Sequence, residues 1–176
     1  MRNSYEVRAQ RFVREIFPFL MDCVNCYDYE KATYNYMIEH PTRNVCCAHG
    51  LTRVALITSD YVVKIDYNEE QVARFGGGEK EIAFYAMAER EGMAHLFAKI
   101  TRYDFCGRTF YIMPRVKGVS EERWEDAWCY MTEEEADWCL DHNLYDLHAR
   151  NYGLHKGKVT IIDYGAYDEE EEDSQE

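Results

Sequence analysis

The sequence predicts an α+β fold, because strand patterns and helix patterns occupy separate stretches of its 176 residues. Three stretches are typical of two strands joined by a short turn, at residues 50–65, 97–113 and 151–162. Four stretches have the apolar spacing or the boundary residues of helices, at residues 5–22, 27–38, 79–89 and 132–140. We therefore expect an antiparallel sheet with helices packed around it.

Residues 1–44 predict a helical extension. An apolar stripe at helical spacing runs through residues 5–22 and is interrupted by Pro18. Its members are Val7, Phe12, Val13, Ile16, Phe17 and Leu20. A second helix is predicted over residues 27–38, with Tyr34, Met37 and Ile38 as apolar residues. We expect these helices to pack beneath a functional site or to bind a partner.

The central residues predict two strand pairs and a helix between them. The first pair turns at residues 58–60 and the second at residues 106–108. The helix at residues 79–89 begins just after Gly76, Gly77 and Gly78. No Gly-Lys-Ser/Thr follows these glycines, so we interpret them as a connector rather than a phosphate-binding loop.

A capping box predicts the start of the last helix. Thr132 and Glu135 have the spacing of this motif, and Ala136, Cys139 and Leu140 are expected to face inward.

The most informative motif is the run from Asp146 through Leu147, His148, Ala149 and Arg150 to Asn151, with Asp163-Tyr164-Gly165 behind it. Phosphoryl transfer depends mainly on positioning and charge neutralisation. Asp146 can accept the proton of an attacking hydroxyl, while Asn151 and Asp163 can supply oxygen ligands to Mg²⁺. A hairpin of residues 151–154 and 159–162 would place the two ligands side by side. The motif therefore predicts a Mg-ATP site.

This arrangement resembles the catalytic loop and the Asp-Phe-Gly segment of the protein-kinase-like superfamily, with Tyr164 in place of Phe. The resemblance covers residues 46–165 and is closest to small kinase-like proteins of bacteriophages. The Asp-Leu-His order at Asp146 is shared with aminoglycoside and choline kinases. The resemblance implies a five-stranded antiparallel N-lobe with one helix and a truncated helical C-lobe that carries the catalytic hairpin.

The same resemblance implies how the nucleotide phosphates are held. Lys64, in Val62-Val63-Lys64-Ile65, corresponds to the strand lysine that binds the α- and β-phosphates. Gly50, Thr52 and Arg53 correspond to the loop that covers the phosphates. The full glycine-rich signature of that loop is absent, and Gly50 is its single glycine here.

Lys64 also needs a carboxylate from the helix that follows it. Glu81 has Phe84, Tyr85 and Ala88 on its own helix face, which predicts that it points inward. Glu79 remains an alternative, and we choose Glu81 as the third catalytic residue beside Asp146 and Lys64.

Residues 113–118 resemble a kinase hinge, with Met113 as gatekeeper. Pro114 would supply a carbonyl and Val116 a backbone N–H to adenine. The proline then stands where no N–H is required.

Two departures from the family bear on the substrate. Leu144 stands where kinases usually carry His, and the chain stops soon after Gly165. We expect the activation segment and the peptide-docking helices to be missing. Any transfer should then favour a small molecule, or the protein's own Tyr, Ser and Thr residues, over generic peptides.

We expect four parts along the chain: a helical extension (1–44), an N-lobe (45–116), a minimal C-lobe (117–167) and a disordered acidic tail (168–176). The predicted function is an ATP- and Mg²⁺-dependent phosphotransferase of bacteriophage origin. The alternative is a catalytically inactive kinase-like protein that binds and modulates a host protein.

The composition restricts the partners. A net charge of −13 argues against a nucleic-acid partner, because binding a phosphate backbone relies on Lys and Arg. No apolar run reaches the ~18 residues of a membrane span, and the start lacks a signal-peptide pattern. We expect a cytoplasmic protein that binds a nucleotide and no membrane.

Seven cysteines without a secretory signal predict reduced thiols. A zinc site is one reading of Cys23, Cys26, Cys46, Cys47 and His49, whose spacing is roughly that of a zinc ribbon. The first pair lacks a Gly or Pro knuckle, so we favour buried apolar cysteines instead.

Overall fold

The computed structural model describes residues 4–117, 126–155 and 158–165. The predicted acidic tail lies outside the described residues. The helices and 3₁₀ turns are α1 (Ser4–Leu20), α2 (Cys26–Glu39), α3 (Glu69–Phe75), α4 (Gly78–Arg90), η1 (Ala94–Leu96), η2 (Ala127–Tyr130) and α5 (Glu133–Asp141). The strands are β1 (Cys46–His49), β2 (Arg53–Ile57), β3 (Tyr61–Asp66), β4 (Thr101–Phe105), β5 (Arg108–Pro114), β6 (Tyr152–His155) and β7 (Lys158–Ile161).

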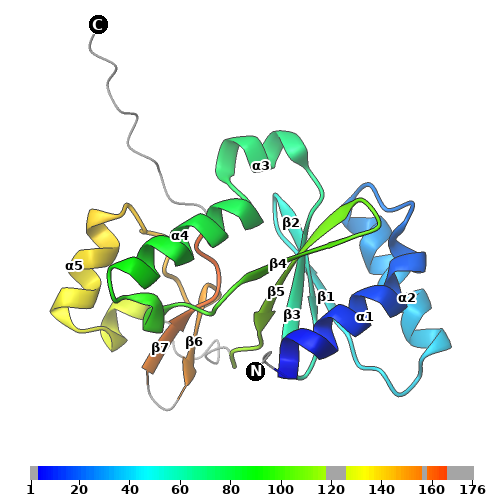
Figure 1. Ribbon diagram of the computed structural model, residues 1–176, viewed down its shortest axis with the longest axis horizontal. Helices are drawn as coiled ribbons and strands as arrows, with labels where there is room; N and C mark the ends of the chain where they lie inside the picture. The colour runs from blue at the N-terminus through cyan, green and yellow to red at the C-terminus, as the bar shows by residue number, and fades with distance from the viewer. Residues whose placement is uncertain (1–3, 118–125, 156–157, 166–176) are drawn as a thin grey trace, which may run out of the picture.

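The first five strands form one antiparallel sheet in the order β1-β2-β3-β5-β4, and β6 and β7 form a separate antiparallel hairpin (Figure 1). This confirms the predicted α+β class and the five-stranded antiparallel sheet. The hairpin is joined to the segment between η1 and β4, where the Ala98 N–H donates to the Ile161 carbonyl at 2.9 Å.

One face of the sheet is covered by α1 and α2 (Figure 1). Strand side chains alternate between the two faces, so Val63 and Ile65 of β3 join the core beneath these helices. Phe12 of α1 and Tyr36 of α2 meet edge to face there, with ring centroids 5.7 Å apart. The N-terminal helices therefore share a single core with the sheet.

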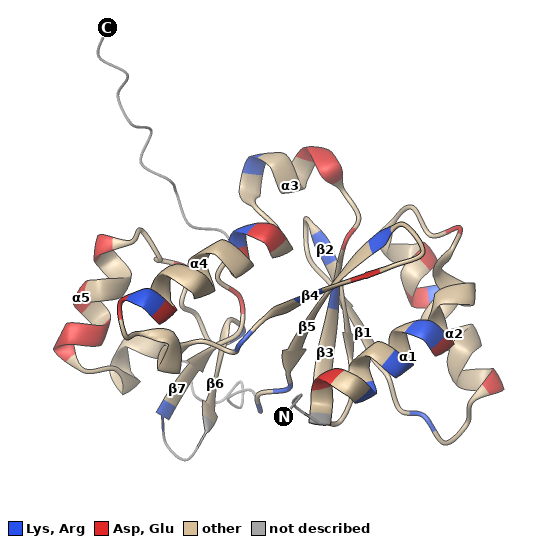
Figure 2. Ribbon diagram, in the orientation of Figure 1, with Lys and Arg blue, Asp and Glu red and all other residues tan. Residues whose placement is uncertain are grey.

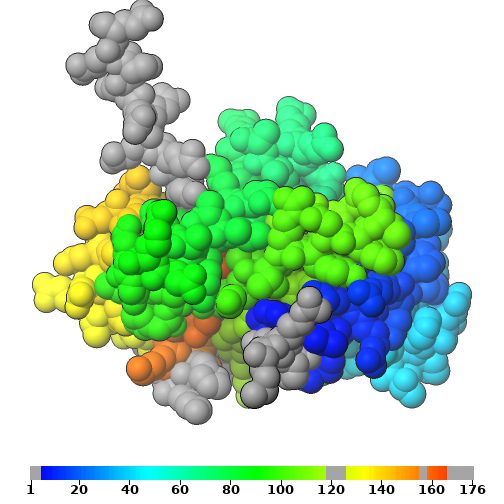
Figure 3. Space-filling view, in the orientation of Figure 1, coloured from blue at the N-terminus to red at the C-terminus, as the bar shows by residue number. Residues whose placement is uncertain are grey.

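The other face carries α4, and beyond α4 lie α5 and the β6–β7 hairpin. Phe84 of α4 is the centre of this second core, with ring centroids 5.3 Å from Phe97, 5.7 Å from Trp138 and 5.9 Å from Tyr164. Figure 3 shows α4 and α5 on one side of the molecule and α1 on the other, with the β4–β5 hairpin between them. One sheet thus separates two apolar cores.

The N-terminal helices differ from their predicted patterns. Pro18 lies inside the last turn of α1 and does not interrupt it. A proline there removes one helical hydrogen bond, and burial of residues such as Ile16 and Leu20 on the same face compensates for it. Val7 is 42% exposed, and Tyr34 and Ile38 are more than 60% exposed, although all three were expected among the apolar residues of these helices.

The two helix starts predicted after the first strand pair, those of α4 and α5, are present. The α5 capping box forms as expected, with Thr132 Oγ1 accepting from the Glu135 N–H and Glu135 accepting from the Thr132 N–H. Trp138 and Cys139 face inward, whereas Leu140 is 45% exposed, contrary to its predicted orientation. Helix α4 begins at Gly78, one residue before the predicted start.

Two helices, α3 and α4, lie between β3 and β4 along the chain, where one helix was predicted. The additional helix is α3. Its N-cap is Asn68, whose side chain accepts from the Gln71 N–H at 3.2 Å. The helix is only seven residues long and buries none of them, so it lacks the apolar stripe by which a helix is recognised in a sequence.

All seven cysteines lie in the described residues. In the described part of the chain, no group of three or more His, Cys, Asp and Glu side chains can hold a metal ion. All seven cysteines are free, and only Cys23 and Cys139 are buried, so the expectation of buried cysteines holds for these two alone.

None of the helices in the described ranges combines the length and the apolar character needed to cross a lipid bilayer.

Candidate functional site

A cleft of about 710 Å³ lies between the β1–β2 end of the sheet and the β6–β7 hairpin. It is lined by all but one of the residues that the sequence predicted for the site: Gly50, Thr52, Arg53, Lys64, Met113, Pro114, Val116, Asp146, Asn151 and Asp163. The exception is Glu81, which is fully buried directly behind the cleft wall. Residues more than a hundred positions apart are therefore brought to one cavity.

Lys64 is held in place by two acceptors. It lies on β3 on the opposite face from Val63 and Ile65, and its Nζ donates to Glu81 Oε1 at 2.7 Å and to the Ile162 carbonyl at 2.8 Å. Glu81 projects from α4, whose N-terminus is anchored where the Gly78 N–H donates to Asp66 Oδ2 at 3.1 Å. The carboxylate of Glu81 is thus the partner of the lysine.

Glu79, the alternative partner, points elsewhere. Its Oε1 accepts from Arg102 Nη1 at 2.8 Å and from the Tyr111 hydroxyl at 3.1 Å. Its side chain is 58% exposed, on the side of α4 away from Lys64.

Arg53 occupies an unexpected position. It is the first residue of β2 and was expected to help hold the phosphates, but its guanidinium is buried and bridges two carboxylates. Nη1 donates to Glu81 Oε2 at 2.8 Å, and Nη2 donates to Asp163 Oδ1. Two cations and two carboxylates therefore form one network, which satisfies the requirement that buried charges be paired.

This network shifts the pKa values of its members. Burial alone would raise the pKa of Asp163, but the charges of Lys64 and Arg53 outweigh it and hold that pKa below its ordinary value. Burial would lower the pKa of Arg53, and Glu81 and Asp163 reverse the effect and raise it. Asp163 is therefore ionised and Arg53 is charged at neutral pH.

Asn151 and Asp163 lie side by side. The Ile162 and Asp163 N–H groups both donate to the Asn151 carbonyl, at 2.7 Å and 3.3 Å. The Asn151 side chain donates through Nδ2 to the Asp146 carbonyl at 2.9 Å, which leaves its amide oxygen as the acceptor end. The β6–β7 hairpin thus brings the backbones of Asn151 and Asp163 together at one end, and both residues line the cleft.

Asp146 is open to the cleft, with a side chain 58% exposed. Its Oδ1 lies 3.3 Å from His148 Nε2, and His148 Nδ1 accepts from the Arg150 N–H at 3.2 Å. Because Nδ1 is the acceptor, Nε2 carries the proton of the neutral ring and is directed at Asp146. The contact between His148 and Asp146 was not predicted, since a histidine two residues away carries no signal of its own.

The far end of the cleft is formed by residues 113–116. Met113 is buried and pairs with Val62 across the β3–β5 ladder. Gly153 of β6 packs so closely on this segment that a Cβ there would lie 2.5 Å from the Lys117 carbonyl oxygen and 2.5 Å from a methyl group of Val116. Close packing at Gly153 therefore fixes the hairpin against the predicted hinge.

The glycines before α4 pack closely against Gly165, two residues after Asp163. Gly76 has a φ of +86°, and a Cβ there would lie 2.0 Å from the Gly165 carbonyl oxygen. A Cβ at Gly165 would in turn lie 3.0 Å from the Gly77 carbonyl and 3.2 Å from Arg53 Nη2. The glycines at 76–78 are thus more than a connector, because they let α3 and α4 approach the Asp163 segment without intervening side chains.

The residues present suit a magnesium ion in composition. Asp163 offers a carboxylate that is 45% exposed and ionised, and Asn151, which lines the same cleft, offers an amide oxygen. Mg²⁺ in nucleotide sites takes one or two protein oxygens and completes its shell with phosphates and water. One Asp163 oxygen is already engaged by Arg53, so its second oxygen is the one that would face the metal.

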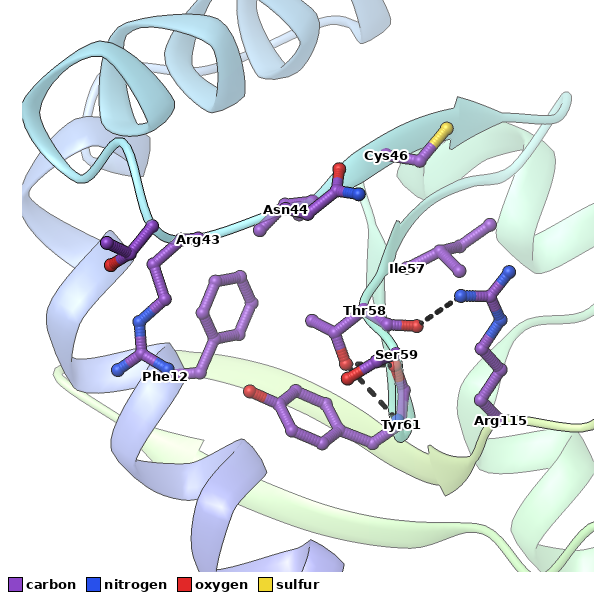
Figure 4. Close-up of a pocket in the computed structure, with 11 residues that line it drawn as sticks. Phe12, Arg43, Asn44, Cys46, Ile57, Thr58, Ser59, Tyr61 and Arg115 are labelled. Carbon is purple, nitrogen blue, oxygen red and sulfur yellow. Dashed lines mark hydrogen bonds between the residues drawn. The ribbon is translucent and has the colours of Figure 1, made fainter.

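A second cavity, of about 370 Å³, lies between α1, the segment before β1 and the β2–β3 turn (Figure 4). Its cationic side chains already have partners: Arg43 is paired with Glu15 at 2.8 Å, and Arg115 donates to the Thr58 carbonyl at 2.8 Å. None of the described residues that line it is an Asp or a Glu, and we take the larger cleft as the functional site.

Comparisons with known proteins give distant similarities only. No protein-family model and no curated protein matches the chain. Among solved structures, it is similar to the Lpg2603 kinase of Legionella pneumophila bound to IP6, with 15% identity and a TM-score of 0.47 over 77% of this chain and 54% of that one. It is also similar to APH(2″)-IIa in a ternary complex with streptomycin and ATP, with 14% identity and a TM-score of 0.41 over 76% and 69% of the two chains. This chain spans about half the length of the first structure.

Proposed function

We propose that the chain is a kinase-like phosphotransferase that binds ATP and Mg²⁺ in the large cleft. The observation that carries the proposal is the convergence of the buried Lys64–Glu81 pair with Asp163, Asn151 and Asp146 on one cavity. This set combines a fixed cation for phosphate, two oxygen ligands for a hard metal ion and an accessible base. Phosphoryl transfer needs these components and little else from a protein.

In this proposal each residue has a role that follows from its contacts. Residues 113–116 bind the adenine of ATP through their backbone, and Lys64 and Arg53 contact the phosphates. Asn151 and Asp163 hold the metal ion, which neutralises charge on the phosphates when bound. Asp146 accepts the proton of the attacking hydroxyl, and His148 orients its carboxylate. Glu81 keeps Lys64 in place.

We further propose that the acceptor is a small molecule. Asp146 is more than half exposed, and its neighbour Arg150 also lines the cleft, so the base is reached from an open cavity. Arg150 can donate to a carboxylate or phosphate on the acceptor. The protein's own Tyr, Ser and Thr residues are the other acceptors to test.

Thermal unfolding with increasing Mg-ATP tests nucleotide binding. A ligand of the folded state stabilises it by about 2.7 kcal/mol at a hundred times its Kd. We expect this stabilisation in the wild type and a loss of its Mg²⁺-dependent part in Asp163→Asn. Asp60→Asn is the matched control, since Asp60 is paired with Arg8 outside the cleft. No stabilisation of the wild type at millimolar nucleotide would contradict the proposal.

Transfer itself is tested with labelled ATP and a panel of small hydroxylated acceptors. We expect label on a small molecule or on the protein, and none after Asp146→Asn. Efficient labelling of generic protein substrates, without label on the protein itself, would contradict the proposed acceptor class.

A second candidate is a catalytically inactive kinase-like protein that acts in the host cytoplasm by binding a host protein. The observation in its favour is the contact of Arg53 with Asp163, which engages an oxygen of the proposed metal ligand. This candidate predicts a stoichiometric protein partner that is retained by Asp146→Ala. It also predicts no phosphate transfer to any acceptor.

A further inference from the structure

Arg53 is bound at both ends of its guanidinium by carboxylates that the proposed function uses. Nη1 contacts Glu81, and Nη2 contacts Oδ1 of Asp163. Glu81 does not depend on this contact, because its other oxygen is taken by Lys64 at 2.7 Å. Asp163 depends on it more, since the next cation among the described residues is Lys64, whose Nζ lies 4.0 Å from Asp163 Oδ1. Arg53 is therefore the principal counter-ion of the proposed metal ligand.

A metal ion and the Arg53 guanidinium compete for the same carboxylate. The Arg53 side chain is only 10% exposed, so an arm released from Asp163 has little access to water. A buried donor without an acceptor is costly, and the released arm would also lie close to a divalent cation. Binding of a metal ion alone is thus opposed by Arg53.

Nucleotide phosphates change this balance. Arg53 lines the cleft next to Thr52 and Gly50, so a phosphate oxygen bound beside Lys64 is within the region that the released arm can reach. A guanidinium is well suited to phosphate oxygens. Nη1 can remain on Glu81 as a pivot. Gly165 has no side chain, and a Cβ there would lie 3.2 Å from Nη2, so the glycine leaves room beside the moving arm.

We propose that Arg53 couples metal binding to nucleotide binding, by holding Asp163 in the free protein and transferring one arm to phosphate when nucleotide is present. This inference rests on the proposed function, since it assumes that the cleft accepts a nucleotide. The free protein should then bind divalent metal weakly. By thermodynamic reciprocity, metal and nucleotide should each strengthen the other by the same factor.

The test is a calorimetric titration of the full chain with Mn²⁺ in the absence of nucleotide. Arg53→Gln removes the competing charge, and we expect it to bind Mn²⁺ roughly ten- to a hundredfold more tightly than the wild type, the factor that a charged hydrogen bond is worth. The gain should disappear in Arg53→Gln with Asp163→Asn, which would locate the metal ion. Arg115→Gln is the matched control, because it removes an arginine that lines the same cleft but donates to a carbonyl.

A second experiment measures the Kd of the β,γ-imido analogue of ATP with and without Mn²⁺. Mn²⁺ should strengthen analogue binding by a larger factor in the wild type than in Arg53→Gln. If the wild type binds no analogue, the proposed function fails, while the titration without nucleotide still reports on Arg53 and Asp163.

Equal Mn²⁺ affinities of the wild type and Arg53→Gln without nucleotide would overturn the inference. Arg53→Lys provides a second variant if the glutamine protein does not fold. A lysine keeps the positive charge beside Glu81 but cannot span both carboxylates, so it should also bind Mn²⁺ more tightly than the wild type.

Discussion

At the scale of single residues, the site depends on buried charges that neutralise one another. Glu81 is fully buried and receives hydrogen bonds from Lys64, from Arg53 and from the Tyr164 N–H. Three donors on one carboxylate satisfy its lone pairs, which is the condition under which a buried charge is tolerated. Removing that charge leaves two cations with too little negative charge beside them.

We therefore expect Glu81→Gln to destabilise the protein by about 3–5 kcal/mol, the cost of breaking a buried ion pair by removing one partner. Urea unfolding monitored by circular dichroism measures this. Glu79→Gln, the same change two positions away on an exposed side chain, should stay within about 0.5 kcal/mol of the wild type. Equal losses in the two variants would show that the network is not a source of stability.

A second residue-scale prediction concerns Asp66, at the end of β3. Burial raises its pKa above the ordinary 3.8, against the lowering effects of the Gly78 N–H and of Arg53. Within the described chain its Oδ1 is buried without a hydrogen-bond partner, which also favours the protonated form. A raised pKa in the folded state contributes stability that is complete below the unfolded pKa and is lost as pH rises through the folded pKa.

Asp66→Asn removes this titration but keeps an oxygen for the Gly78 N–H. We expect the wild type to lose stability relative to this variant as pH rises above about 3.8, the ordinary value for an aspartate. Urea unfolding of both proteins between pH 3 and pH 7 measures the difference. A difference that does not change with pH would argue against a raised pKa.

At the scale of elements, local signals explain most helix and strand positions. The α5 capping box and the strand pairs appear where their turn and cap residues predict them. The short helix α3 was missed because it buries no residue and so has no apolar periodicity. Figure 2 shows acidic residues on α5, in agreement with the three glutamates in its first turn, where they complement the helix dipole.

The contact between the glycines before α4 and the Asp163 segment leads to a prediction at this scale. Gly76→Ala should cost clearly more than about 1–2 kcal/mol, because it adds a collision with the Gly165 carbonyl to the strain of a positive φ. Gly92→Ala is the matched control, since Gly92 has a φ of +82° and no atom within 4 Å of the added Cβ. Gly92→Ala should lower the free energy of unfolding by about 1–2 kcal/mol, the cost of the positive φ without a collision.

Denaturant unfolding compares the two glycine variants, and nucleotide titration shows whether the Asp163 segment has moved. We expect Gly76→Ala to weaken nucleotide binding and Gly92→Ala to leave it unchanged. Similar stabilities of the two variants would mean that the close approach of Gly76 and Gly165 is unimportant.

At the scale of the whole molecule, one sheet lies between two apolar cores, and only one of them lies behind the cleft. Phe12 belongs to the core beneath α1 and α2, and Phe84 to the core behind the cleft. Phe84 lies 5.9 Å from the ring of Tyr164, the residue next to Asp163. Because alternate strand residues face opposite sides, a change in one core reaches the other only through the sheet.

Phe12→Ala and Phe84→Ala should each lower the free energy of unfolding by about 3–5 kcal/mol, since both rings are buried. At temperatures where both variants stay folded, only Phe84→Ala should weaken Mg-nucleotide binding. Chemical unfolding and calorimetry measure the two effects separately. Equal losses of nucleotide affinity would show that the two cores act as one unit.

The sequence by itself determined the α+β class, the antiparallel sheet and the residues that line the cleft. The class, the strand pairs and the placing of Asp146, Asn151 and Asp163 follow from local signals in the sequence. The other cleft residues, among them Lys64 and residues 113–116, were expected from a family resemblance rather than from local signals. The preference for Glu81 over Glu79 also came from the sequence, because an apolar helix face indicates which side of α4 is buried.

Only the tertiary structure decided how the charges of the site are distributed. Arg53 and Asp163 are 110 positions apart, and nothing local in either segment indicates that one arginine bridges Asp163 and Glu81. The close approach of Gly76 to Gly165 is equally non-local. A linear pattern reports which face of an element is buried, whereas the partner of a buried charge depends on which elements pack together, and this is determined by the fold as a whole.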